Sequence, residues 1–359
     1  MTSYVQRVQS WWKLYSSPGH VLRPTSEKAM LVMYGTWVYA FILKLIGSTS
    51  DVAWHFRYLR DDLAPPHNIN TAGTIIVVGL VMFHTWTGFG VDRLTLRLMQ
   101  AGIGTFLLAI PLDLLNHWLF GLDITAWSPT HAMLYLGTAI MLVGALRGLF
   151  LLTPASLWRT GFAFGLWAFL LEDILFPLSQ QEYGVTGLDA LLRGQPYAAP
   201  ELIVAGGNDI TRFAIPIPNW VYPLWIIAMT TVLLLAARLI MQRRWTATII
   251  AAIYLVYRLV AFYLLRQLNF PPSFVPIFIL GGAIMIDLAV MLRWHPLIAA
   301  IATLAAFYGG AWFTESQNVL MPPFPTYTVP ITAALLACIW VGARWIEHSS
   351  FAERWRMIA

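Results

Sequence analysis

The stretch DVAWHFRYLRDDLAPPH, from Asp51 to His67, closes one long apolar segment and opens the next. Proline suits the first turn of a helix, where its missing N–H would have no partner in any case. The stretch therefore predicts the end of one helix, a turn and the start of a second helix, which together make a helical hairpin.

A second stretch of the chain, DLLNHWLFGLDITAWSPTH from Asp113 to His131, repeats this arrangement. Each copy has an aspartate four residues before a histidine, a second aspartate six residues after it, and a second histidine directly after a proline-bearing turn. The four positions are Asp51, His55, Asp61 and His67 in the first copy, and Asp113, His117, Asp123 and His131 in the second. The repeat predicts two equivalent hairpins.

The residue types in the repeat are those of a transition-metal site. An aspartate and a histidine at positions i and i+4 share one helix face, and a histidine brought back across the turn would complete a set of one carboxylate and two imidazoles. The lone cysteine, Cys338, lies in an apolar run, so any metal must use nitrogen and oxygen ligands. The sequence predicts as metal ligands Asp51, His55, His67, Asp113, His117 and His131, and as supporting residues or extra ligands Asp61, Asp62, Asp123, Glu172 and Asp173.

The hypothesis of metal sites has two alternatives. The repeated Asp and His residues could be interfacial polar residues that bond to backbone and lipid headgroups, and Glu172 and Asp173 could belong to a solvated rim. For a metal site, the Asp and His side chains of each hairpin should converge. We expect this for Asp113, His117 and His131, where Pro129 positions the second histidine, and for Asp51, His55 and His67.

The composition is that of a membrane protein. The 359 residues are 58% hydrophobic and only 11% charged, whereas an average soluble domain is roughly 25% charged. The isoelectric point is about 9.4, but the basic residues are spread over short loops and do not form one polar segment, which excludes nucleic-acid binding. We expect the lipid bilayer as the main partner.

Apolar windows of the length that crosses a bilayer as a helix occur ten times. They cover residues 29–55, 68–90, 96–118, 131–152, 157–178, 219–241, 246–265, 273–292, 296–313 and 327–346. The predicted fold class is therefore all-α, a polytopic bundle of about ten transmembrane helices built from repeated hairpins. The excess of Lys and Arg in alternate loops predicts cytoplasmic N- and C-termini and puts both Asp/His stretches at the outer face of the cytoplasmic membrane.

The chain divides into three regions on the same evidence. Residues 1–28 are predicted to form a cytoplasmic, interfacial segment and not a removable signal peptide. Residues 29–152 form a four-helix half that carries the metal motifs, and residues 153–359 form a six-helix half. The long connection 179–218 is expected to cover the outer mouth of the bundle.

Three further ionisable residues inside predicted spans have expected roles. His84 is expected to be a hydrogen-bonded bundle histidine and not a ligand. Arg258 and Asp287 are expected to form a charge pair within the membrane, because ionised groups at that depth need partners.

The two Asp/His motifs resemble those of the C subunit of the copper-dependent membrane monooxygenases, the particulate methane and ammonia monooxygenase family. The resemblance covers about 80 residues, with Asp51, His55 and His67 in the first motif and Asp113, His117 and His131 in the second, where the family has Asn at the first position. It implies copper, oxygen-dependent hydroxylation of a small molecule, and other membrane subunits. The chain has more spans than such a subunit.

Two functions follow from the sequence as hypotheses. The first is a membrane metalloprotein that binds copper, or else iron or zinc, and acts as an oxidoreductase of the monooxygenase kind. The second is a cation transporter or a structural membrane subunit without redox chemistry, which the repeated hairpins and the intramembrane charges motivate.

Overall fold

The structure is a computed structural model of the 359-residue chain. It describes residues 6, 9, 12–55, 63–120, 128–179, 194, 204, 217–270, 274–317, 319 and 321–347. For residues 52, 55, 117, 120, 178 and 179 it describes the backbone only. The predicted outer connection 179–218 lies almost entirely outside the described residues.

The described part of the chain is built from helices. They are α2 (Glu27–His55), α3 (Pro65–Thr87), α4 (Arg93–Phe120), α5 (Pro129–Leu152), α6 (Leu157–Ser179), α9 (Val221–Met241), α10 (Thr246–Gln267), α11 (Phe278–Met291), α12 (Pro296–Ser316), the 3-10 turn η2 (Thr326–Thr328) and α13 (Val329–Glu347). Within these residues nine helices are long and apolar enough to cross a membrane. The predicted all-α membrane bundle is confirmed.

Helix α11 corrects one predicted span. The apolar window covers residues 273–292, but the helix begins only at Phe278 and has 14 residues. Its length is about 21 Å at 1.5 Å per residue, less than the roughly 30 Å of a bilayer core. Residues 274–277 are not helical. A proline disfavours the helical conformation of the residue before it, here Val275, so the helix does not extend back through Pro276.

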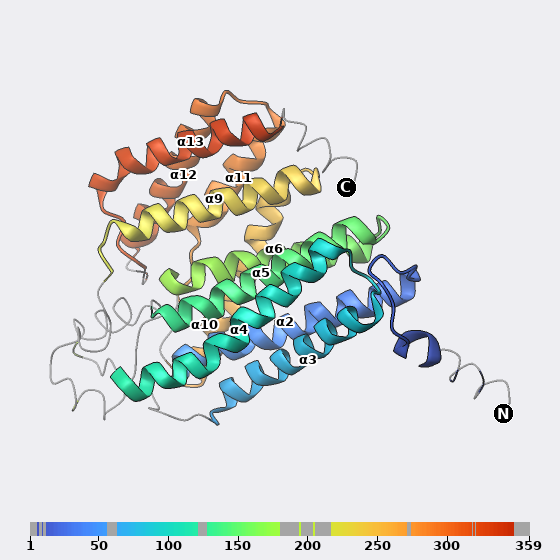
Figure 1. The fold of residues 1–359 in the computed structure, drawn as a ribbon. Coiled ribbons are helices and arrows are strands. Elements are labelled where there is room, and N and C mark those ends of the chain that lie inside the picture. The colour runs from blue at the N-terminus through green and yellow to red at the C-terminus, as the bar shows by residue number, and fades with distance from the viewer. Residues whose placement is uncertain are drawn as a thin grey trace.

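Helix α6 lies at the centre of the bundle (Figure 1). It packs against α2 and α5 from the two N-terminal hairpins and against α9 and α10 from the C-terminal half. The hairpins α2–α3 and α4–α5 form one part of the molecule, and α9 with α11–α13 forms the other, with α10 in contact with both α6 and α11. Residues from these two parts can therefore meet across α6 and α10.

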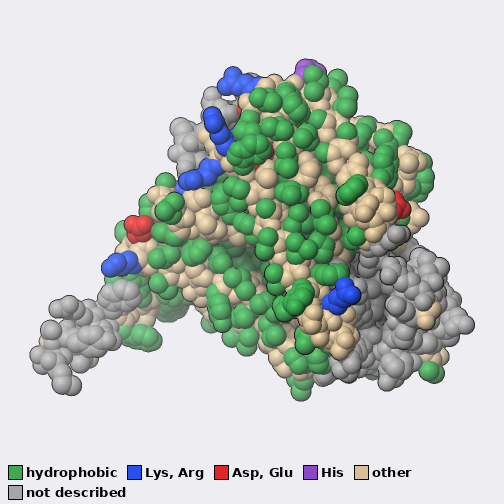
Figure 2. Space-filling model, turned by 180° about the vertical axis from the view of Figure 1, so that it is seen from behind, with side chains coloured by type: hydrophobic (Ala, Val, Ile, Leu, Met, Phe, Trp, Pro, Cys, Tyr) green, Lys and Arg blue, Asp and Glu red, His purple; other side chains and the backbone are tan. Residues whose placement is uncertain are grey.

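The surface agrees with a bilayer environment. Figure 2 shows one face of the molecule covered largely by hydrophobic side chains, with few Lys, Arg, Asp and Glu side chains on it. Large apolar side chains such as Ile75, Met82 and Val256 are more than half exposed. Together with the nine apolar helices, this makes the chain an integral membrane protein.

The segment before α2 packs onto the turn between α3 and α4. The Gly19 amide donates to the Trp86 carbonyl, and the Arg23 guanidinium lies 4.3 Å from the centre of the Phe89 ring. Gly88 has φ +70 and lies so close to this segment that a side-chain carbon would be 1.9 Å from the His20 carbonyl oxygen. Only glycine combines this backbone conformation with this approach.

Asp92 ties the start of α4 to α5. Its carboxylate accepts a hydrogen bond from the Thr95 amide at 2.9 Å, as a residue before a helix often does, and forms an ion pair with Arg147. Burial raises the pKa of the Asp92 carboxyl, but the hydrogen bonds from Arg147 and Thr95 outweigh burial and hold that pKa below its ordinary value. The carboxylate is therefore ionised at neutral pH.

Helices α2 and α3 pack closely because glycines face the partner backbone. A side-chain carbon at Gly73 would lie 2.7 Å from the Ala40 carbonyl oxygen, and one at Gly47 would lie 2.7 Å from the Asn70 amide nitrogen. Such contacts are shorter than real carbon atoms accept, so only glycine permits this helix spacing.

The α4–α5 hairpin packs in the same register. A side-chain carbon at Gly137 would lie 2.8 Å from the Gly102 carbonyl oxygen. Gly73 and Gly137 each follow the post-proline histidine by six residues, and Ala40 and Gly102 each precede the motif aspartate by eleven. The two hairpins thus share both their Asp/His motif and the contact that sets their spacing.

We expect Gly73→Leu to destabilise the protein and Gly79→Leu to leave it as stable as the wild type. Overpacking typically costs about 1–3 kcal/mol, whereas a side-chain carbon at Gly79, on the same helix, would meet no atom within 4 Å. Thermal melting of the purified proteins in one detergent measures the difference. Equal melting temperatures for the two variants would contradict the close packing.

Candidate functional site

The first hairpin brings Asp51 and His67 together. Asp51 lies in the last turn of α2, and His67 follows Pro65 and Pro66 in the first turn of α3. The His67 Nε2 atom lies 2.8 Å from the Asp51 Oδ1 atom, with 34% and 28% of the two side chains exposed. The pair is therefore near the surface but partly shielded.

The second hairpin places Asp113 and His131 in the equivalent positions. Asp113 lies near the end of α4, His131 lies in the first turn of α5, and the His131 Nε2 atom is 3.7 Å from the Asp113 Oδ1 atom. The Thr130 hydroxyl donates to Asp113 Oδ1 at 2.6 Å, and Ser128 accepts from the His131 amide at 3.1 Å. These two bonds hold the aspartate and the start of α5 in place.

The predicted placement of these residues at helix ends is therefore confirmed in both hairpins. The side chains of His55 and His117, and all of Asp61, Asp62 and Asp123, lie outside the described residues, so the third member of each set stays a prediction. Among the described side chains, no three His, Cys, Asp or Glu residues gather as a metal site.

Glu172 and Asp173 are not part of a solvated rim. Only 1% of Glu172 and 6% of Asp173 is exposed, inside α6. Neither joins one of the two Asp/His pairs in a group of three metal-binding side chains. We assign both residues to a buried charge network, described next, and not to the metal motifs.

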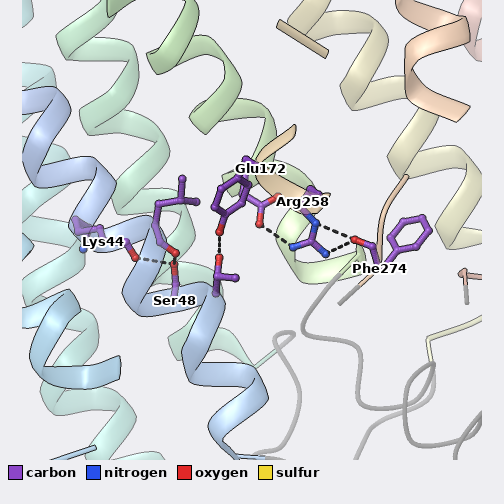
Figure 3. Close-up of polar contacts among 8 residues, drawn as sticks. Lys44, Ser48, Glu172, Arg258 and Phe274 are labelled. Atoms are coloured by element: carbon purple, nitrogen blue, oxygen red, sulfur yellow. Dashed lines mark hydrogen bonds and ion pairs between the residues drawn. The ribbon is translucent and has the colours of Figure 1, made fainter. Parts of the chain in front are cut away.

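Arg258 is the centre of this network (Figure 3). Its Nη1 atom lies 3.2 Å from Glu172 Oε1, and its Nε and Nη2 atoms donate to the Phe274 carbonyl at 2.9 and 2.6 Å. Arg258 and Asp287 therefore do not form the predicted pair. Phe274 lies in the non-helical segment before α11, so Arg258 supplies the hydrogen bonds that this carbonyl cannot obtain from a helix.

Asp287 forms its ion pair with Arg238 and not with Arg258. Its Oδ1 atom lies 3.2 Å from Arg238 Nε, and its carboxylate accepts from the Ala247 amide at 3.3 Å and from the Thr248 amide and hydroxyl at 2.8 Å each. Asp287 in α11 thereby binds the free amides at the start of α10, a favourable place for a negative charge.

Lys44 extends the charged region toward α3 and α4. Its ammonium group is buried and donates to Asn70 Oδ1 at 3.0 Å and to Thr74 Oγ1 at 3.2 Å, and it lies 3.5 Å from the centre of the Phe106 ring. In Figure 3, Lys44 and Ser48 lie on the α2 side of the Glu172–Arg258 pair. A hydrogen bond between Thr49 and Tyr257 joins α2 to α10.

His84 is a hydrogen-bonded histidine of the bundle, as predicted. The Trp37 indole N–H donates to His84 Nε2 at 3.0 Å, and His84 Nδ1 lies 2.8 Å from the Phe89 carbonyl oxygen. Nδ1 must therefore carry the proton, and both ring nitrogens are occupied. Its exposed fraction is 0%, so His84 is a structural residue and not a ligand.

Two features were not predicted from the sequence, the buried cation Lys44 and the glycine-contact register that the α2–α3 and α4–α5 hairpins share. Lys44 is a lysine in the middle of an apolar window, which is itself a signal because charges at that depth need partners. The register could have been found from the pattern that follows each proline turn, since His67 and His131 are each followed by Gly and Thr at positions six and seven.

No protein family, curated protein or solved structure matches the chain. Its function must therefore be argued from its own residues.

Proposed function

We propose that this integral membrane protein is a metalloprotein whose two hairpins each bind a transition-metal ion at the same end of the bundle. The observation that carries the proposal is the repetition of one geometry. Asp51 with His67, and Asp113 with His131, meet at equivalent ends of α2–α3 and α4–α5. Polar residues that merely face lipid headgroups have no reason to recur in one register.

The atoms of both pairs lie close to the separation that a metal ion requires. Two donors at about 2.0–2.2 Å from one ion lie about 3 to 3.5 Å from each other. The observed separations, 2.8 and 3.7 Å, lie just below and just above this range, so a small movement of each pair would admit an ion. Imidazole nitrogen and carboxylate oxygen suit copper, iron and zinc alike. Partial exposure of the four side chains leaves a route for an ion to enter.

The chain's own residues would have distinct roles. His55 and His117 each follow the aspartate by one helical turn and would supply the second imidazole. Thr130 orients the Asp113 carboxylate, because its hydroxyl donates to Oδ1. Asp61, Asp62 and Asp123 would orient imidazole N–H groups or add ligands. A bound copper or iron ion would supply redox chemistry.

Copper is our first choice of metal, since affinity for nitrogen and oxygen ligands peaks at copper among these ions. With copper, the resemblance to the monooxygenase C subunit supports an oxidoreductase that hydroxylates a small molecule, together with other membrane subunits. The charge distribution supports an orientation with both sites at the outer face and both termini in the cytoplasm.

Metal analysis of the purified full-length protein tests the proposal. We expect up to two ions per chain in the wild type and one ion fewer in either His67→Ala or His131→Ala. His20→Ala, which removes an exposed histidine outside both motifs, should retain the wild-type amount.

A wild-type protein that holds no stoichiometric copper, iron or zinc would contradict the metal proposal. The alternative, a cation transporter or structural subunit, would then be tested by ion flux in proteoliposomes. Loss of metal in His20→Ala as well would show that the ion binds outside the two motifs.

A further inference from the structure

We propose that Asp173 is a proton-binding site inside the membrane, with Lys44 as the cation that opposes protonation. The carboxylate takes a proton from hydronium, an O–H bond forms, and water and a neutral carboxylic acid result. The site is distinct from the two Asp/His pairs, because it lies on α6 and includes neither pair.

Asp173 is a deeply buried carboxylate without a close partner. Only 6% of the residue is exposed. Its Oδ2 atom is buried and has no hydrogen-bond partner among the described residues. An isolated ionised carboxylate in an apolar interior is costly, and such a group tends to take up a proton instead.

The other two buried carboxylates of the described spans, unlike Asp173, each form an ion pair with an arginine. Glu172 has the Arg258 guanidinium at 3.2 Å, and Asp287 has the Arg238 guanidinium at 3.2 Å with three further donors. Asp173 alone of the three has no cation in an ion pair with it. Among these three carboxylates, Asp173 is therefore the one whose ionised form has the fewest stabilising partners.

Lys44 acts on Asp173 from a distance. Lys44 is a buried cation on α2, the helix that packs against α6, and no ion pair joins Lys44 to Asp173 in the described structure. The ammonium group is instead held by Asn70 and Thr74 and by the face of the Phe106 ring. This anchoring keeps a positive charge near Asp173 without neutralising it by contact.

The remaining charged and titratable neighbours come from two helices. On α6 itself, Glu172 is the adjacent residue, and its carboxylate carries a charge of the same sign as that of Asp173. On α10, Arg258, Tyr254 and Tyr257 face Glu172. The charged or titratable groups of α5 and α9 that form ion pairs have other partners, His131 with Asp113, Arg147 with Asp92 and Arg238 with Asp287. Because Arg258 already pairs with Glu172, Lys44 is the cation left to balance Asp173.

Infrared difference spectroscopy of the full-length protein in lipid, recorded as the pH is lowered, tests this site directly. A protonated carboxyl group without hydrogen bonds gives a carbonyl band at higher frequency than an acid in water. We expect the wild type to gain such a band reversibly, Asp173→Asn to lack it, and Glu315→Gln, which alters an exposed carboxylate, to keep it.

Lys44→Met supplies a second readout. Without the opposing cation, the acid band of Asp173 should persist to a higher pH than in the wild type. A wild type that shows no such band at any pH where it stays folded would overturn the proposal, as would a band that remains in Asp173→Asn. An unchanged titration in Lys44→Met would overturn the role of Lys44. Melting curves confirm that each variant is folded.

Discussion

Arg258→Met should be among the most destabilising single substitutions in this protein. It leaves Glu172 as a buried charge without its guanidinium and the Phe274 carbonyl without its two donors. Breaking a buried ion pair by removing one partner costs about 3–5 kcal/mol, and an unsatisfied buried carbonyl adds about 1–3 kcal/mol. We expect a strong fall in melting temperature in detergent and a low yield of folded protein.

Arg266→Met is the matched control, because Arg266 is an exposed arginine near the end of the same helix. It should melt like the wild type. The double variant Arg258→Met with Glu172→Gln should recover part of the lost melting temperature. It removes the uncompensated charge of Glu172 but still leaves the Phe274 carbonyl without its two hydrogen-bond donors. If Arg258→Met melts like Arg266→Met, the network does not hold α6, α10 and the start of α11 together.

The helices could be predicted because their signals are local. An apolar window of bilayer length, or a proline at the start of such a window, predicts a helix without any information about which other helices pack against it. The exception is α11, where the apolar window extends through Pro276 but the helix does not. Mean hydropathy treats residues 273–292 as one apolar run, whereas Pro276 disfavours a helical conformation in the residue before it, so the helix begins only after the proline.

The meeting of Asp51 with His67, and of Asp113 with His131, could also be predicted. Each pair spans one turn between consecutive helices, so the chain itself limits how far apart the side chains can lie. The glycine contacts that set the helix spacing were visible in the same pattern. They require comparison of the two copies position by position over a longer stretch, including Gly73 and Gly137.

The charge partners could not be predicted, because they come from helices distant in sequence. Arg258 and Asp287 are the two charged residues of neighbouring predicted spans, yet they pair with Glu172 and Arg238. Glu172 is 86 residues from Arg258. The choice depends on α6 lying between the two parts of the bundle, which no local pattern encodes.

Asp287→Leu is the second substitution from which we expect a large loss. Asp287 is fully buried, pairs with Arg238 and binds the Ala247 and Thr248 amides at the start of α10. Leucine removes the charge partner of a largely buried arginine, which costs about 3–5 kcal/mol, and also removes the cap of α10, which contributes about 1 kcal/mol.

The order of stability among three variants separates these effects. Asp287→Asn keeps one oxygen that can accept from the α10 amides but loses the charge, so it should melt between the wild type and Asp287→Leu. Arg238→Met combined with Asp287→Leu should melt above Asp287→Leu alone, because no unpaired charge remains. Glu315→Gln, an exposed carboxylate at the end of α12, should melt like the wild type. If Asp287→Leu also melted like the wild type, the carboxylate would support neither Arg238 nor the start of α10, and the packing of apolar side chains alone would have to hold α9, α10 and α11 together.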